Sequence, residues 1–129
     1  MTSSSPLRIF TLEYDAATNS IFPHVRYIAP DNVLQDLYKV LKCDMVTCTK
    51  IEVKGERFDV YSDDETLLKD EPAPNLYIDD DLIIFGSVAF AKSDEEGKLA
   101  GLTREEVHLL WDFALVQFAK LLTFFKKRR

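Results

Sequence analysis

The C-terminal end of the chain places the strongest constraint on its fold. Residues 103–129 read TREEVHLLWDFALVQFAKLLTFFKKRR and contain no Gly or Pro. Thr103 and Glu106 have the spacing of a capping box, in which an N-cap Ser or Thr is followed three residues later by Glu. We therefore predict one long helix over residues 103–127. At about 1.5 Å per residue it would reach roughly 36 Å, which is longer than a small domain needs.

Large apolar side chains occur on both halves of this predicted helix. At 100° per residue, most of them fall on one arc about 140° wide, the face expected to pack on a sheet: Val107, Leu110, Trp111, Ala114, Leu115, Phe118, Leu121, Leu122 and Phe125. Others fall on the polar half, where each would leave roughly 1.5–3 kcal/mol of burial unused: Leu109, Phe113, Val116 and Phe124. Such a face indicates a protein partner, although packing within one chain is the simpler alternative. The candidate interface residues are Trp111, Phe113, Phe118, Phe124 and Phe125.

Alternating or apolar stretches upstream predict five β-strands, over residues 7–14, 21–28, 45–53, 57–61 and 82–91. Pro23 cannot donate a hydrogen bond to a neighbouring strand, so the second strand is expected at a sheet edge or at a bulge. Lys54-Gly55 is a turn sequence that joins the third and fourth strands in a hairpin. Gly86 interrupts the fifth strand and indicates a bulge or a close backbone approach.

One shorter helix is predicted between the second and third strands. Pro30 and Asp31 open it, because Pro fits a first turn and Asp suits the positive end of the helix dipole. Its buried stripe recurs at three- and four-residue steps: Leu34, Leu37, Tyr38 and Leu41. The predicted fold is α+β, a mostly antiparallel sheet of about five strands with one short helix and one long C-terminal helix packed on it. We expect residues 1–6 to be a disordered tail and 7–129 a single domain.

The negative charge of the chain is concentrated in one segment. The net charge is −6, yet residues 63–81 alone carry −7. Direct binding of nucleic acid is not expected, because phosphate neutralisation needs clustered Lys and Arg. We predict a solvated surface loop here, while a Mg²⁺ or Ca²⁺ site and mimicry of nucleic-acid phosphate remain alternatives. The segment contains Asp63, Asp64, Glu65, Asp70, Glu71, Asp79, Asp80 and Asp81 against Lys69.

The sequence carries no signature of a catalytic or cofactor site. It lacks the G-x-S-x-G, G-x-x-x-x-G-K-S/T and H-E-x-x-H patterns. Cys43 or Cys48 could pair with His24 or His108 in a Cys–His dyad, but nothing in the local sequence brings them together. We therefore predict no catalytic, cofactor-binding or metal-binding residues. The two cysteines fit neither a zinc site nor a secreted disulfide framework, and the N-terminus does not resemble a signal peptide, so a cytoplasmic location is expected.

The last residues of the chain allow contact with a membrane surface. Phe124 and Phe125 precede a run of four basic residues, 126–129, which resembles an aromatic and basic anchor. A spanning helix is not expected, because Asp112, Gln117 and Lys120 interrupt the only run long enough to cross a bilayer. We therefore keep a peripheral membrane contact through residues 124–129 as an alternative.

Several short motifs follow one another in the order seen in a known family. They are Val33-Leu34-Gln35-Asp36-Leu37, Tyr61-Ser62-Asp63-Asp64-Glu65, Leu67-Leu68, Pro74-Asn75, Ile84-Phe85-Gly86-Ser87-Val88, Leu102-Thr103 and Glu105-Glu106. Over about residues 7–107 the chain thus resembles the domain-of-unknown-function family number 3846 of phages, conjugative elements and the bacteria rich in them. The family has no settled activity, so the resemblance implies a mobile-element context and a cytoplasmic location but no chemistry. Residues 113–129 extend beyond the resemblance.

These observations favour a non-enzymatic cytosolic interaction protein of phage or mobile-element type. We expect it to self-associate through its C-terminal helix and to act on a host protein. A second hypothesis is a protein that binds or sequesters a small ligand such as a nucleotide, because pockets often form between the subunits of small oligomers. An enzyme with Cys or carboxylate chemistry is a third hypothesis, which the absence of motifs disfavours.

Overall fold

The chain folds as α+β, as predicted, in a computed structural model that describes residues 6–15, 17–18, 20–43, 45–63, 74–79, 82–85 and 87–127. At residues 20, 74–79, 82–85 and 116–127 only the backbone is described. The strands are β1 (Leu7–Asp15), β2 (Ser20–Ile28), β3 (Val46–Val53), β4 (Glu56–Asp63), β5 (Pro74–Asp79), β6 (Leu82–Phe85), β7 (Val88–Ser93) and β8 (Leu99–Ala100). The helices are α1 (Val33–Leu41) and α2 (Arg104–Lys127).

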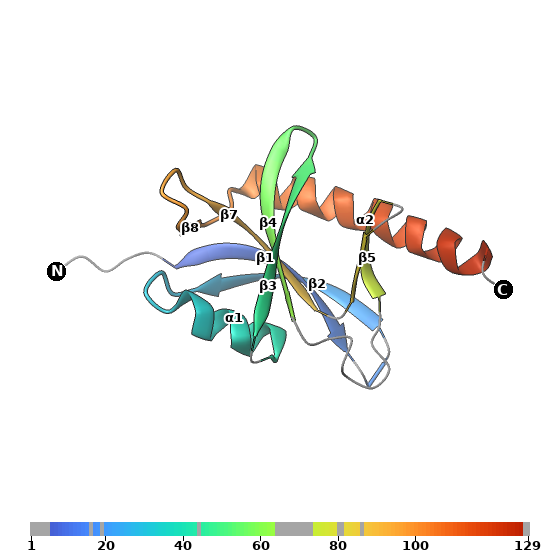
Figure 1. The fold of residues 1–129 in the computed structure, drawn as a ribbon, viewed down its shortest axis with the longest axis horizontal. Coiled ribbons are helices and arrows are strands. Elements are labelled where there is room, and N and C mark those ends of the chain that lie inside the picture. Colours follow the sequence, from blue (N-terminus) through green and yellow to red (C-terminus); the bar gives the residue numbers. More distant parts are fainter. Residues whose placement is uncertain are drawn as a thin grey trace.

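An antiparallel sheet forms the centre of the fold. Its strands lie in the order β2-β1-β7-β4-β3, and the short β8 pairs with the end of β7. Two local hairpins, β1–β2 and β3–β4, therefore flank β7, which comes later in the chain. In Figure 1, β3 and β4 run across the direction of β1 and β2, as in a strongly twisted sheet. A separate two-stranded sheet, β5–β6, lies beside α2.

The apolar run 82–91, predicted as one central strand, is divided between the two sheets. Leu82–Phe85 pairs with β5, whereas Val88–Ser93 is the central strand of the main sheet. The prediction was wrong because an all-apolar run has no period that would mark a change of sheet. The acidic segment was also predicted wrongly in part, since Pro74–Asp79 is a strand. Its residues 64–73 and 80–81, and the predicted bulge at Gly86, lie outside the described residues.

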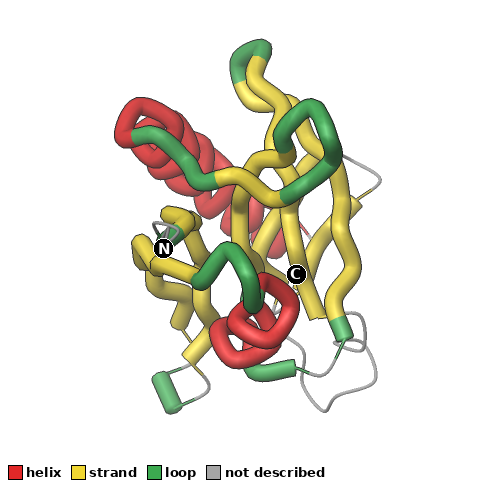
Figure 2. Tube along the Cα trace, turned by 90° about the vertical axis from the view of Figure 1, so that its left-hand side faces the viewer, coloured by secondary structure: helices red, strands yellow, loops and turns green. Residues whose placement is uncertain are grey.

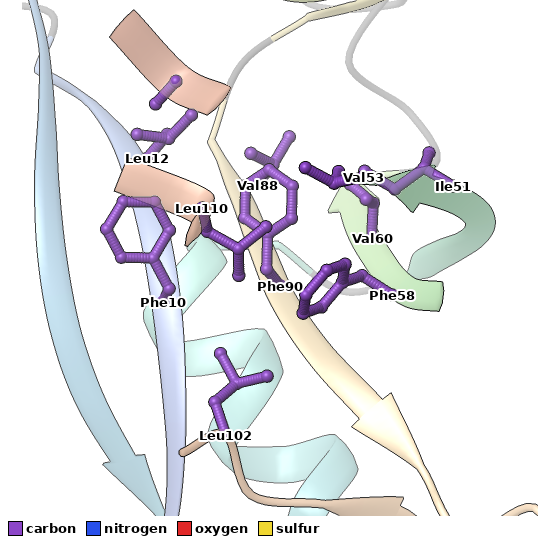
Figure 3. Close-up of a cluster of buried hydrophobic side chains, with 11 residues drawn as sticks. Phe10, Leu12, Ile51, Val53, Phe58, Val60, Val88, Phe90, Leu102 and Leu110 are labelled. Carbon is purple, nitrogen blue, oxygen red and sulfur yellow. The ribbon is translucent and has the colours of Figure 1, made fainter. Parts of the chain in front are cut away.

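One helix covers each face of the sheet, as the two views in Figures 1 and 2 show. Side chains alternate along β1 and β7, so Ile9 and Ala89 face α1 while Phe10 and Phe90 face α2. The core beneath α2, drawn in Figure 3, contains Phe10, Leu12, Ile51, Val53, Phe58, Val60, Val88, Phe90, Leu102, Leu110 and Ala114. The core beneath α1 is smaller and contains Ile9, Ile28, Leu37, Leu41, Ala89 and Ala91.

The capping box predicted at the start of the long helix is confirmed. The Thr103 backbone N–H donates to Glu106 Oε1 over 2.8 Å, and the Glu106 N–H donates to Thr103 Oγ1 over 3.2 Å. These two bonds satisfy donors that the first turn of a helix otherwise leaves without a partner. Helix α2 then runs without a break from Arg104 to Lys127.

The face that α2 turns to the sheet differs from the predicted one. Leu110 and Ala114 are buried as expected, but Leu109 and Phe113, predicted on the polar half, also pack against the core. Trp111 and Leu115, both predicted on the buried arc, are exposed. The helix is thus rotated relative to the prediction, since both halves carry enough apolar residues to serve as the inner face.

Two other sequence predictions are confirmed and one is corrected. Lys54 and Gly55 form the β3–β4 turn, with positive φ angles of 50° and 85°. Pro23 lies in the edge strand β2. Helix α1 begins at Val33 rather than at residues 30–31, and Leu34, predicted in its buried stripe, is 53% exposed. That prediction was wrong because a nine-residue helix buries only the narrow stripe that contains Leu37 and Leu41.

Candidate functional site

Exposed apolar side chains lie on the edge strand β2 and on α2, on either side of the strand β1 that both elements contact. Its members are Val25 (44% exposed) and Tyr27 (60%) on β2, with Trp111 (44%) and Leu115 (56%) on α2. We call these four residues the β2–α2 surface. The sheet residues of the core beneath α2 belong to β1, β3, β4 and β7, with Ile21 of β2 packed against them, whereas Val25 and Tyr27 farther along β2 are exposed.

Phe10 of β1 connects the two halves of this surface. Val25 lies directly opposite Phe10 in the β1–β2 register. The Trp111 ring meets the Phe10 ring edge-on, with the ring centroids 6.1 Å apart. Phe10 itself is fully buried, so Val25 and Trp111 flank one core side chain from two different elements. Leu115 follows Trp111 at i+4 and therefore lies on the same side of α2.

The start of α2 is held against β1 close to this surface. The Leu102 N–H donates to the Arg8 carbonyl over 2.8 Å, and Arg8 Nη1 donates to the Leu102 carbonyl over 3.3 Å. The Arg8 guanidinium also lies 6.0 Å from the centroid of the Tyr27 ring, within the range of a cation–π contact. A Cβ at Gly101 would lie 3.1 Å from the Arg8 nitrogen, so glycine permits this close approach.

The candidate interface residues named from the sequence have different surroundings. Trp111 belongs to the β2–α2 surface. Phe113 is partly buried and its ring meets the Phe90 ring edge-on, with centroids 6.3 Å apart. The side chains of Phe118, Phe124 and Phe125 lie outside the described part of the chain, as does the basic end at 128–129.

A charged cluster ties the sheet to the first turn of α2. Lys92 Nζ lies 2.7 Å from Glu56 Oε2 and 2.5 Å from Glu106 Oε2, and 5.2 Å from the centroid of the Phe58 ring. Burial alone would raise the pKa of Glu106, but hydrogen bonds from Lys92 and from the Thr103 N–H outweigh it and lower that pKa. Hydrogen bonds to Glu106 and Glu56 raise the pKa of Lys92. Lys92 and Glu106 therefore stay ionised near neutral pH.

On the opposite face of the sheet, Asp59 is a buried acid, only 3% exposed. Lys50 Nζ lies 2.6 Å from its Oδ1, and the Ser93 hydroxyl donates to its Oδ2. Both carboxylate oxygens therefore have partners within the chain, as a buried charge requires.

The structure separates Cys48 from His24, one of the pairs that sequence analysis considered as a Cys–His dyad. His24, Thr11, Ala89, Tyr61 and Cys48 follow one another across the sheet in register. His24 and Cys48 thus lie four strand spacings apart, about 19 Å. Burial, and then the charge of Asp59, raise the pKa of the Cys48 thiol, which disfavours the nucleophilic thiolate.

The remaining candidates are an exposed His108 on α2 and a partly buried Cys43 that packs against the core beneath α1. The two residues belong to opposite faces of the sheet, because α2 and the core beneath α1 are separated by it. The described residues therefore bring no imidazole to Cys48.

A second polar network joins β1 and β2. The Arg26 guanidinium makes two hydrogen bonds to the Glu13 carboxylate, of 2.7 and 2.8 Å, and the Thr11 hydroxyl donates to Glu13 Oε2 over 2.5 Å. Burial would raise the pKa of Glu13, but the hydrogen bonds from Arg26 and Thr11 lower it overall. These hydrogen bonds stabilise the pairing of the edge strand β2 with β1.

Neither a metal cluster nor a membrane span occurs among the residues that the structure describes. Within that part of the chain, no three His, Cys, Asp or Glu side chains are grouped so as to hold a metal ion. None of its helices is long and apolar enough to cross a bilayer. Most of the acidic segment, where a hard cation was an alternative, is outside that part.

Sequence analysis missed three of the four members of the β2–α2 surface. Leu115 was placed on the buried arc, and Val25 and Tyr27 were not singled out. One signal was present, since Pro23 marks β2 as an edge strand and edge strands are often incompletely covered by a helix. No sequence signal fixed the rotation of α2 that exposes Leu115.

The chain matches a known protein family but no individual curated protein or solved structure. The family described as "Domain of unknown function (DUF3846)" matches residues 16–114. The match covers most of the chain and ends within α2, so Trp111 lies inside it and Leu115 just beyond it. The chain therefore belongs to the DUF3846 family of domains of unknown function.

Proposed function

We propose that this protein is a non-enzymatic, cytoplasmic interaction protein of phage or mobile-element type, and that it self-associates through the β2–α2 surface. One observation carries the proposal: Val25 of an edge strand and Trp111 of a helix are both exposed apolar residues next to the buried Phe10. Exposed apolar residues of separate elements that neighbour one core side chain are candidates for a protein–protein interface.

Covering this surface would contribute favourable free energy to a contact between two copies. Fully burying a large apolar side chain contributes roughly 1.5–3 kcal/mol. Val25, Tyr27, Trp111 and Leu115 are each about half exposed, so each offers about half of that amount. A twofold contact uses the same surface on both subunits and doubles the sum. Trp and Tyr are also the residues that most often carry binding energy.

Charge along α2 favours a second copy as the partner. From residue 104 to 115 the sequence carries Arg104 against Glu105, Glu106 and Asp112, a net charge of −2. From 116 to 129 it carries only basic residues, Lys120 and 126–129, a net charge of +5. Two α2 helices side by side in opposite directions would bring unlike charges together along their length.

The test measures molar mass by size-exclusion chromatography with light scattering at several concentrations. Leu115→Glu places a charge in the surface and should lower the mass of the wild-type oligomer. Leu34→Glu is the matched control, because Leu34 is 53% exposed but lies on α1, across the sheet. A wild-type protein that stays monomeric at every concentration would contradict the proposal, and so would equal effects of the two variants.

Fluorescence gives a second readout at the surface itself. Trp111 is the only tryptophan of the chain, and it is 44% exposed in the single chain. Self-association through this surface should shift its emission to shorter wavelength as the concentration rises. No shift in a sample whose mass does rise would place the contact elsewhere.

A further inference from the structure

The two outer edges of the main sheet differ in their capacity to pair with another strand. Edge strand β2 contains Pro23, which has no N–H to donate. Edge strand β3 contains no Pro, and its eight residues pair with β4 in an unbroken register from Val46 to Val53. Within the described part of the chain, no strand pairs with the other side of β3. That side therefore presents a regular row of backbone donors and acceptors.

Charged side chains on the β3–β4 hairpin form an alternating pattern at this edge. In the register of the hairpin, Lys50 lies opposite Asp59 and Glu52 lies opposite Arg57. Lys50 and Glu52 are two residues apart and therefore project from the same face of the sheet. Both are exposed. The β3 edge thus carries one positive side chain, Lys50, and one negative side chain, Glu52. Each lies beside an unlike charge on β4.

We propose that β3 pairs antiparallel with β3 of a second copy, with Ile51 on the twofold axis. In this register Lys50 lies opposite Glu52 of the partner subunit, and the symmetry creates the same pair twice. A row of side chains across the contact then alternates in sign: Asp59 and Lys50, followed by Glu52 of the partner subunit and Arg57 of the partner subunit. Unlike charges directly opposite one another across two strands are stabilising, and like charges are destabilising.

The charges select this register against its neighbours. A side chain stays on the same face of the sheet only if the pairing shifts by two residues. Each such shift moves the twofold axis by one residue along β3. With Lys50 on the axis, two lysines face each other, and with Glu52 on the axis, two glutamates do. With Thr49 on the axis, Lys50 faces Cys48 of the partner subunit and no charges pair. The register centred on Ile51 also continues the core beneath α2, to which Ile51 and Val53 already belong.

This contact is independent of the β2–α2 surface and does not rest on the proposed function. Strands β2 and β3 are the opposite edges of the sheet, with β1, β7 and β4 between them. A chain with both twofold contacts forms assemblies larger than a dimer, whereas loss of either one leaves dimers. The two contacts can therefore be tested separately.

The main experiment uses two charge reversals in a Leu115→Glu background, which removes the β2–α2 contact. The Leu115→Glu protein should be a dimer in light scattering. Adding Lys50→Glu, or adding Glu52→Lys, should place like charges opposite one another and halve the mass. Mixing these two proteins in equal amounts should restore the dimer, because each then faces the unlike charge. Dimers unaffected by either reversal, or a mixture that remains monomeric, would overturn the proposal.

A second measurement uses the wild-type protein, because a charge reversal at Lys50 or Glu52 also places like charges opposite Asp59 or Arg57 of the same chain and can impair folding. Amide hydrogen exchange is compared at low and high protein concentration. Residues 46–53 should exchange more slowly at high concentration, because the outer N–H groups of β3 become hydrogen-bonded. Residues 59–62 of β4, which pair with β3 on one side and β7 on the other, are the internal control. Exchange in β3 that does not depend on concentration would overturn the proposal, and it would do so whether or not the β2–α2 surface self-associates.

Discussion

Lys92 of the central strand β7 and Glu106 in the first turn of α2 form an ion pair with 2.5 Å between Nζ and Oε2. Glu106 is also the second member of the capping box with Thr103. The Glu106 carboxylate thus caps the first turn of α2 and also binds Lys92 in the middle of the sheet. The β2–α2 surface depends on this attachment, because Trp111 lies little more than one turn farther along α2.

The pair should make stability depend on pH in a defined way. The pKa of Glu106 is lowered in the folded state, so its contribution is present above the ordinary value of 4.5 and is lost as the pH falls through the folded value. Lys92→Met, which keeps contact with Phe58, should lower the free energy of unfolding by about 1–2 kcal/mol at pH 7. Urea titrations should show this difference shrinking below pH 4.5. A difference that is constant from pH 7 to pH 3 would contradict the assignment.

Truncation should lower stability by different amounts at two neighbouring positions on α2. Phe113→Ala removes a ring that packs on Phe90 and should cost about 2–3 kcal/mol of the free energy of unfolding. Leu115→Ala, at a residue that is 56% exposed, should cost less than about 1 kcal/mol. Thermal and urea unfolding at a concentration where the protein is monomeric measure both. A larger cost for Leu115→Ala than for Phe113→Ala would mean that α2 packs in the rotation expected from the sequence.

The β3–β4 turn offers a stabilising and a destabilising substitution side by side. Lys54 has φ of 50°, a value that Asn adopts more easily than Lys, so Lys54→Asn should stabilise the protein by about 0.5 kcal/mol. Gly55 has φ of 85°, and Gly55→Ala should destabilise it by about 1 kcal/mol because a side chain is strained there. The same unfolding curves decide both. A stabilising Gly55→Ala would be incompatible with this turn.

The Cys48 thiol should react slowly for an exposed cysteine. Its pKa is raised from 9.0 by burial and by Asp59, so little thiolate is present at pH 7–8. In a Cys43→Ala background, iodoacetamide should modify Cys48 more slowly than it modifies free cysteine, and the rate should still be rising at pH 9. A rate that levels off near neutral pH would mean that Cys48 is already a thiolate there, which would contradict a raised pKa.

Local features of the sequence predicted local structure well. The capping box at Thr103, the turn at Lys54-Gly55 and the edge strand marked by Pro23 each depend on a few adjacent residues with specific backbone requirements. The α+β class followed from the order of strand-like and helix-like periods. In each case the physical cause lies within a few residues of its effect.

Choices that depend on distant partners could not be predicted from the sequence. Leu109 and Phe113 are as apolar as Trp111 and Leu115, so only the shape of the sheet surface around Phe10 and Phe90 determines which pair faces inward. The division of residues 82–91 likewise depends on where β5 lies. The candidate site combines β2 with α2, which are about eighty residues apart in the sequence, so no local pattern could reveal it.

The position of β7 between two hairpins also has a consequence for how the chain reaches its fold. The hairpins β1–β2 and β3–β4 each form from neighbouring residues, but neither pairs with the other. Their inner edges are joined only when β7 inserts between them, more than twenty residues after the end of β4. During synthesis, both edges therefore stay open until Ser93 has left the ribosome, and α2 must follow before the core closes. The slow step of folding should be this late, long-range insertion rather than formation of either hairpin.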